Sequence, residues 1–171
     1  MKKILKNADL NIVDYKFNRD DKEWKLTTYH QIEDQLYEFP FQAESKGTLN
    51  YFCLGPVIKD ALEKGKTIVI DEIDSGLHPM LVKYLIGIFH NIDENINGAQ
   101  IIVNTHDIAQ LTLDQFRRDQ IYFVEKNYFT GISDLYSLDE YSPRKSENIQ
   151  KGYLLGRYGA IPVVGTEDIQ W

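Results

Sequence analysis

Two short runs of β-branched and apolar residues constrain the fold of this chain more than any other feature. Residues 67–71 read TIVID and residues 100–105 read QIIVNT, and the apolar residues of neither run alternate with polar ones. Such runs are typical of strands that are covered on both faces inside a parallel sheet. Residues 78–92 lie between them and repeat apolar residues at helical spacing, with Pro79 suited to a first helical turn. Strand, helix and strand in this order predict a doubly wound α/β layer.

The first half of the chain predicts a hairpin and a long helix. Residues 8–17 and 24–32 alternate polar and apolar side chains well enough to form two strands, with a polar turn between them. A helix is expected to begin after its cap Ser45 and to close at Gly65, with a kink or a restart at Pro56.

The second half predicts shorter elements. Residues 106–116 indicate a short helix, and residues 120–126 and 133–138 indicate two further strands. Residues 142–164 begin as a polar helix and end in a tail punctuated by Gly and Pro. The stretch RYGAIP in that tail could dock a companion protein, but we expect it to form a turn that packs the terminus.

Composition limits the class of protein. The 171 residues suffice for one compact unit, and a net charge of −7 argues against a large surface that neutralises nucleic-acid phosphates. The single cysteine, Cys53, allows no internal disulfide, suits a reducing compartment and is expected to be a small core residue. No apolar stretch is long enough to cross a bilayer, and the first residues lack the pattern of a signal peptide. We therefore expect a cytoplasmic protein without a membrane partner.

Three carboxylates follow the first apolar run, where its strand ends. In an open parallel sheet, ligands bind beyond the carboxyl ends of the strands, which is where Asp71, Glu72 and Asp74 are predicted to lie. Three acids there repel one another unless a cation or a polarised water gathers them. Helix capping by Asp74 or Ser75 is the structural alternative, but it does not account for Asp71 and Glu72. The pattern favours a metal or nucleotide site.

The second apolar run ends in NTHD, so His106 is expected at the same edge of the sheet as Asp71. An imidazole there could contact a phosphate oxygen or an attacking water. The other histidines have no such context, and we interpret them as structural: His30, His78 and His90.

The stretch ESKGT supplies a third element. Ser45 and Gly47 lie at a predicted helix start, where free backbone N–H groups and the helix dipole favour an anion, and where Gly permits close approach. Helix caps of this kind are common, so this signal becomes specific only in combination with the other two.

The order of the three stretches resembles a known family. ESKGT, TIVIDEIDSGLHP and NTHD look like the signature motif, the Walker B strand with its D-loop, and the His switch of ABC-type ATPases, in the branch shared with SMC-type and overcoming-lysogenization-defect proteins. The resemblance implies the C-terminal half of a three-layer α/β P-loop NTPase fold, with parallel core strands and an antiparallel edge.

Later segments narrow the resemblance. RRDQIYFVEKN, SDLYSL and YLLGRYGAIP are similar to the C-terminal region of bacterial AAA-family ATPases of abortive-infection and phage-defence loci, including the Rlo type. The similarity runs from about Ala8 to the end, so residues 1–171 would be one C-terminal portion of an ABC-type ATPase domain. It implies ATP and Mg²⁺ as cofactors, an anti-phage role and a nuclease-like effector as a partner.

Within one subunit, the resemblance assigns three roles. Asp71 would hold Mg²⁺ through water, Glu72 would orient and activate the hydrolytic water, and His106 would contact the γ-phosphate. These are the parts that phosphoryl transfer requires: a positioned water, a metal and donors for developing negative charge.

Across the interface of a head-to-tail homodimer, the resemblance assigns four more residues. Asp74 and Ser75 would lie on the D-loop, while Ser45 and Gly47 would bind the γ-phosphate of a nucleotide held by the opposite subunit. Lys46 departs from the Gly that is usual in ABC transporters and agrees with the defence-type pattern.

A phosphate-cradling loop of the form G-x-x-x-x-G-K-[ST] is missing from this sequence. The closest match, DALEKGKT at residues 60–67, has Asp60 in the first Gly position and runs from a helix into a strand, which is the reverse of the required order. We interpret it as a helix end with Gly65 as the C-cap. The chain is therefore expected to need an N-terminal half that carries Walker A, on the same or a separate chain, and to be inactive alone.

Two other functions are compatible with the residues. A Toprim-like nuclease could use Asp71, Glu72 and Asp74 as Mg²⁺ ligands, although it would need a further upstream Glu at a strand end, and neither Glu38 nor Glu44 is well placed. An orphan fragment could act without catalysis as a dimerisation or binding module. DNA binding by the full assembly is left open.

Overall fold

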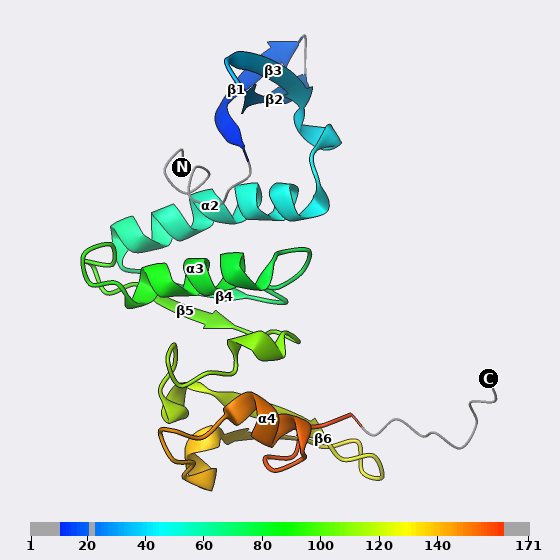
Figure 1. The fold of residues 1–171 in the computed structure, drawn as a ribbon, viewed down its shortest axis with the longest axis vertical. Helices are drawn as coiled ribbons and strands as arrows, with labels where there is room; N and C mark the ends of the chain where they lie inside the picture. The colour runs from blue at the N-terminus through cyan, green and yellow to red at the C-terminus, as the bar shows by residue number, and fades with distance from the viewer. Residues whose placement is uncertain (1–10, 21–22, 163–171) are drawn as a thin grey trace, which may run out of the picture. The chain divides into compact units, whose positions relative to one another are not determined.

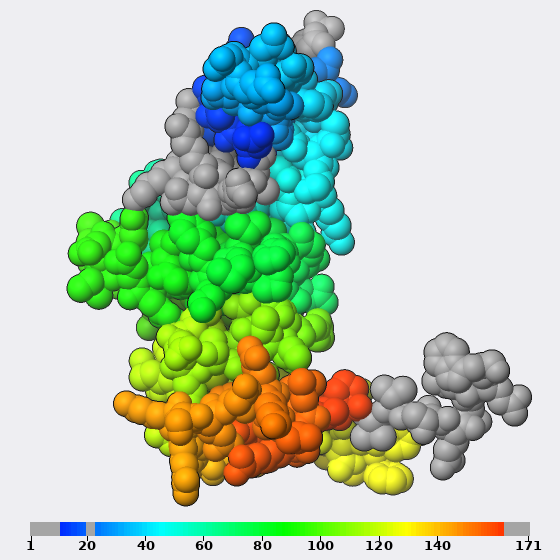
Figure 2. All heavy atoms as spheres, in the orientation of Figure 1, coloured from blue at the N-terminus to red at the C-terminus, as the bar shows by residue number. Residues whose placement is uncertain are grey.

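The computed structural model describes residues 11–20 and 23–162, which form two compact units, Met1–His106 and Asp107–Trp171. The length of the chain had suggested one unit. Figure 2 shows the atoms of the first unit in blue to green and those of the second in yellow-green to orange-red. The predicted strand residues 8–10 and the tail residues 163–164 lie outside the described residues.

An antiparallel sheet of three strands opens the first unit (Figure 1). It consists of β1 (Ile12–Asp20), β2 (Glu23–Ile32) and β3 (Gln35–Pro40), with β2 in the middle. The hairpin of the first two strands is confirmed. The third strand was not predicted, and a short 3₁₀ turn, η1 (Phe41–Ala43), links it to the next helix.

Helix α2 (Lys46–Lys64) has the predicted ends. The Ser45 hydroxyl accepts a hydrogen bond from the backbone N–H of Thr48, and Gly65 closes the helix in the left-handed conformation at φ 64°. The helix runs through Pro56 without the expected restart. A proline inside a helix costs about 3 kcal/mol, which burial of the inner face of the helix outweighs. The buried residues of that face are Thr48, Tyr51, Phe52, Gly55, Ile58 and Ala61.

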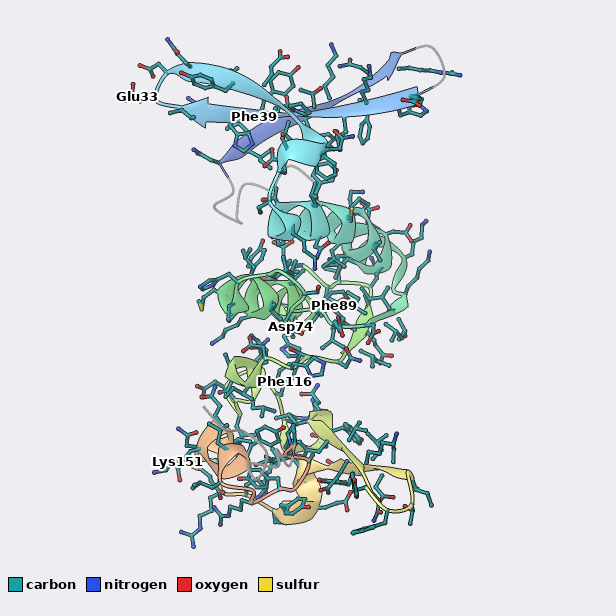
Figure 3. The ribbon with its side chains drawn as sticks, turned by 90° about the vertical axis from the view of Figure 1, so that its right-hand side faces the viewer. Glu33, Phe39, Asp74, Phe89, Phe116 and Lys151 are labelled. Carbon is teal, nitrogen blue, oxygen red and sulfur yellow. The ribbon has the colours of Figure 1, made fainter. Side chains whose placement is uncertain are left out.

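A parallel pair of strands forms the base of the first unit. Strands β4 (Thr67–Ile70) and β5 (Gln100–Val103) pair in parallel, and α3 (Pro79–His90) connects them. In Figures 1 and 3, α2 and α3 lie side by side; α2 contacts β4, and α3 contacts β5. The other face of the pair is open, with Val69 74% and Ile102 57% exposed. The prediction that both faces of these strands are covered is therefore wrong within the described residues.

The second unit packs a hairpin against short helices. Strands β6 (Tyr122–Lys126) and β7 (Ser133–Ser137) are antiparallel, as their sequences predicted. Around them lie the 3₁₀ turns η2 (Ile108–Gln110), η3 (Arg118–Gln120) and η4 (Leu138–Tyr141), and helix α4 (Ile149–Leu154). The core cluster of this unit consists of Ile121, Phe123, Leu138, Ile149 and Tyr158.

Several local predictions are wrong. Residues 106–116 do not form one helix. They contain the 3₁₀ turn η2, which the Asp107 carboxylate caps at its start by accepting from the N–H of Ala109, and a separate turn at residues 113–115. The helix expected from residue 142 begins at Ile149. Cys53 lies exposed on α2 rather than in the core.

Among the described residues, no helix combines the length and the apolar character that crossing a membrane would require.

The RYGAIP stretch packs as expected. The ring of Tyr158 is buried and stacks on Phe123 at 5.8 Å, and its hydroxyl donates to Glu147 at 2.7 Å. Gly152 gives the ring room, because a Cβ there would lie 2.8 Å from it. Tyr158 of this stretch is therefore part of the core of the second unit.

Candidate functional site

Asp71 and Glu72 lie directly beyond β4, and Asn104 lies directly beyond β5. The two strands end level, since Ile70 pairs with Val103. The Asn104 amide donates from Nδ2 to Oδ1 of Asp71 at 2.5 Å, and its Oδ1 accepts from the backbone N–H of Glu72 at 2.5 Å. One side chain thus joins the ends of both strands.

Glu72 and His106 meet at this edge. Nε2 of His106 lies 4.0 Å from Oε1 of Glu72, and the two side chains are 88% and 60% exposed. Glu72 adopts a left-handed backbone at φ 48°, which is uncommon for a residue with a Cβ and is here held by the Asn104 hydrogen bond. A pair this exposed contributes little to stability, so folding alone does not explain it.

The loop after Glu72 is anchored by two buried apolar side chains, Ile73 and Leu77. Between them lies Asp74 (Figure 3), whose Oδ1 atom is buried and has no hydrogen-bond partner among the described residues. The alternative that Asp74 or Ser75 caps the next helix is wrong. His78 is the N-cap of α3, and its Nδ1 accepts from the N–H of Met80 at 3.2 Å.

His78 therefore has the structural role that we expected. The carboxylate of Asp74 is left without the local backbone partner that a cap would have. A buried carboxylate oxygen without a donor is costly, so each such atom in a native protein calls for an explanation.

The start of α2 packs against the same loop. A Cβ on Gly47 would lie 2.2 Å from the carbonyl oxygen of Gly76, so only glycine fits there. Nδ2 of Asn50 donates to the carbonyl of Ser75 at 2.6 Å. Ser45 and Gly47 are thereby held beside the loop that carries Asp74 and Ser75.

The seven predicted residues thus form two groups within the first unit. Asp71, Glu72 and His106 share the strand-end edge, and the other four share the contact between the start of α2 and the loop. Among the described residues, no hydrogen bond or ion pair joins Ser45 or Gly47 to the strand-end group.

Sequence reasoning missed Asn104 and Asn50. Asn104 stands inside the quoted NTHD stretch, and an amide can donate and accept at the same time, which a strand-end junction between a carboxylate and an N–H requires. This ability of an amide was the signal in the sequence that could have identified Asn104. Nothing in the spacing of Asn50 indicates its partner, because the contact spans 25 positions in the sequence.

Asp71 fits a site for a hard cation. Its exposed carboxylate uses Oδ1 for Asn104, and Oδ2 makes no hydrogen bond or ion pair within residues 11–20 and 23–162. In the same residues, no group of three or more His, Cys, Asp and Glu side chains is gathered closely enough to hold a metal ion. A site built jointly from Asp71, Glu72 and Asp74 is therefore not formed in this structure.

The DALEKGKT segment is a helix end, as expected. The Lys66 ammonium lies 2.6 Å from Oδ2 of Asp60, and Lys64 donates to the other oxygen of the same carboxylate. These two lysines lower the pKa of Asp60 to about 2. Lys66 is thus paired with Asp60, the residue that stands where a phosphate-cradling loop would have its first glycine.

The chain matches known proteins in two comparisons. Residues 2–114 match the family described as "AAA domain, putative AbiEii toxin, Type IV TA system". A solved chain from work on ATP-driven dimerization and DNA-stimulated activation of SMC ATPases has a similar fold, with a TM-score of 0.52 and 15% sequence identity. The alignment covers 84% of this chain and 89% of that one, and at this identity it shows a P-loop NTPase-like fold. No curated protein matches significantly.

Proposed function

This chain belongs to the AAA-domain family just described, and we propose that it is the C-terminal part of an ABC-type ATPase that positions the hydrolytic water. The family and the fold are those of nucleotide-binding ATPases. The observation that carries the proposal is the meeting of Glu72 and His106, 4.0 Å apart, at the strand end beside Asp71.

At this edge each residue has a distinct task. Glu72 accepts a hydrogen bond from the attacking water and takes up its proton, and His106 donates to an oxygen of the γ-phosphate. Asp71, with its carboxylate oriented by Asn104, would hold Mg²⁺ through water. When bound, the ion neutralises charge on the phosphate oxygens.

The second group acts on the nucleotide of an opposite subunit in a head-to-tail homodimer. Ser45 and Gly47 offer the hydroxyl and the free backbone N–H groups of a helix start to the γ-phosphate. Asp74 and Ser75 line the interface. The packing of Gly47 against Gly76 supports this assignment, because it holds the helix start and the loop together.

A phosphate-cradling half completes the site in this proposal. Parallel sheets are normally covered on both faces, and the open face with Val69 and Ile102 supports a further layer there. Walker A, on the same or another chain, would belong to that layer. Without it, this part binds ATP poorly, since its own contacts form late and across an interface.

The biological setting is a further part of the proposal. The family description names an AbiEii toxin and a type IV TA system, and we propose an anti-phage role of the Rlo type in the cytoplasm. In that role, the nucleotide state of the dimer would control a nuclease-like effector. DNA binding has no support from the charge of this chain, which is −7.

Glu72→Gln tests the proposal in the complete assembly. The amide keeps the size of the side chain but cannot take a proton from water, so we expect ATP to stay bound and turnover to fall by about 10²-fold or more. Single-turnover and steady-state assays of phosphate release measure both effects. Glu63→Gln is the matched control, since the Glu63 side chain is exposed and pairs with Lys59 on the surface of α2. Unchanged turnover in Glu72→Gln would refute the assignment.

A metal-dependent nuclease remains testable in the same preparation. It predicts cleavage of DNA without ATP that disappears in Asp71→Ala. The separation of Asp71, Glu72 and Asp74 into two groups favours the ATPase.

A further inference from the structure

The junction between the first sheet and α2 holds a carboxylate that the proposed hydrolysis does not use. Glu44 lies between η1 and α2, and its side chain is only 9% exposed. Its Oε1 atom accepts a hydrogen bond from Nε2 of His30 at 2.6 Å and another from the hydroxyl of Thr28. Both donors belong to β2. One oxygen atom therefore ties the sheet to the segment that enters α2.

The donors explain why the carboxylate stays in this place. Oε1 of Glu44 is the acceptor in this contact when the His30 ring carries its proton on Nε2. The His30 and Phe39 rings are T-shaped to each other, with the centroids 5.0 Å apart, and Thr28 is fully buried. A carboxylate this deeply buried is unfavourable unless donors surround it. His30 and Thr28 supply those donors.

The place of Glu44 matters because Ser45 follows it directly. Two residues later, Gly47 approaches the carbonyl of Gly76 so closely that no side chain fits between them. A shift of the helix start by a fraction of an ångström would therefore open or break this contact. The loop that carries Asp74 would move with it.

We propose that Glu44, held by His30 and Thr28, is a positioning residue that sets the start of α2 against the Asp74–Gly76 loop. This inference rests on the function proposed above. Glu44 does not touch the nucleotide, because its carboxylate is buried and already engaged. It acts through Ser45 and Gly47, which would reach the γ-phosphate of the opposite subunit only when the helix start is in place.

Two variants that break the junction, one that preserves it and one control test the proposal. Glu44→Leu and His30→Leu remove the acceptor oxygen and its ring donor. His30→Gln keeps an N–H donor at a similar distance. Glu33→Gln is the control, since Glu33 lies in the turn at the end of the same sheet (Figure 3) and is exposed.

Amide hydrogen exchange of the chain is the first measurement. We expect Glu44→Leu and His30→Leu to raise exchange about tenfold at residues 46–50 and 74–77, the size expected for loss of a hydrogen bond to a charged group. His30→Gln and Glu33→Gln should leave exchange at the wild-type level. Unchanged exchange in these segments, or an equal rise throughout the Met1–His106 unit, would overturn the proposal.

ATP turnover of the complete assembly is the second measurement. We expect the two disruptive variants to lower kcat about tenfold with KM unchanged, because ground-state binding would belong to the other half of the site. If the wild-type assembly hydrolyses ATP and both variants keep the same kcat as the wild type, the positioning role is overturned. If the wild-type assembly does not hydrolyse ATP while local exchange rises as expected, the positioning stands and the proposed function fails.

Discussion

Asn104 is the residue on which the strand-end geometry depends. Its amide engages the carboxylate of Asp71 and the backbone of Glu72 at once, and it fixes Glu72 in a left-handed conformation. The residues Asp71, Glu72 and His106 could be selected from the sequence because strand ends of a parallel sheet share an edge. The left-handed backbone conformation of Glu72 could not be predicted from the sequence, because no neighbouring residue requires a φ above zero.

Gly47 provides a prediction at the same scale. Gly47→Ala should lower the free energy of unfolding by about 1–3 kcal/mol, because the new methyl group would overlap the carbonyl of Gly76. Urea unfolding measures the change. Gly87→Ala is the matched control: Gly87 is also inside a helix, and a Cβ there meets no atom within 4 Å.

For the control, we expect a gain of about 0.5–1 kcal/mol, since alanine loses less backbone entropy than glycine in a helix. If Gly47→Ala proves as stable as Gly87→Ala, the close contact between α2 and the loop does not exist in solution.

At the scale of elements, the segments with strong caps or continuous apolar runs were predictable. The ends of α2 followed from Ser45 and Gly65, and the parallel pair followed from its two apolar runs. Strand β3 was not predictable, because all six of its residues are exposed and it is held by backbone pairing with β2. The exposed face of the parallel pair was not predictable either, since an apolar run does not reveal whether a covering layer is present.

The tail of the second unit allows a prediction on pH. The hydrogen bond from the Tyr158 hydroxyl, and to a smaller extent the nearby arginines, lower the pKa of Glu147 below its ordinary value. Burial, and to a smaller extent the neighbouring Glu147, raises the pKa of Tyr158 to about 12. The stability from the ionised Glu147 is present above the ordinary glutamate pKa and is lost as the pH falls through the lower pKa of the folded protein.

We therefore expect Tm to fall between pH 5 and pH 3 less steeply in Glu147→Gln than in the wild type. Thermal unfolding across this range, followed by near-ultraviolet circular dichroism of the tyrosines, measures the slopes. Asp134→Asn is the control from the same unit, because Asp134 is exposed on β7. Parallel curves for wild type and Glu147→Gln would show that this carboxylate does not stabilise the second unit.

At the scale of the whole molecule, the sequence predicted the ATPase class, which the family match and the fold now show. It did not predict the division at His106 into two compact units. The homodimer, the phosphate-cradling half and the effector remain proposals, because they concern surfaces of other subunits. The open face of β4 and β5 is the feature of this chain that they would explain.

A structure of the complete Glu72→Gln assembly with ATP and Mg²⁺ tests the central claim most directly. The account predicts that Asp71, residue 72 and His106 of one subunit surround the γ-phosphate, its metal and a water, while Ser45 and Gly47 of the opposite subunit close over the same phosphate. A nucleotide bound away from the ends of β4 and β5 would contradict it.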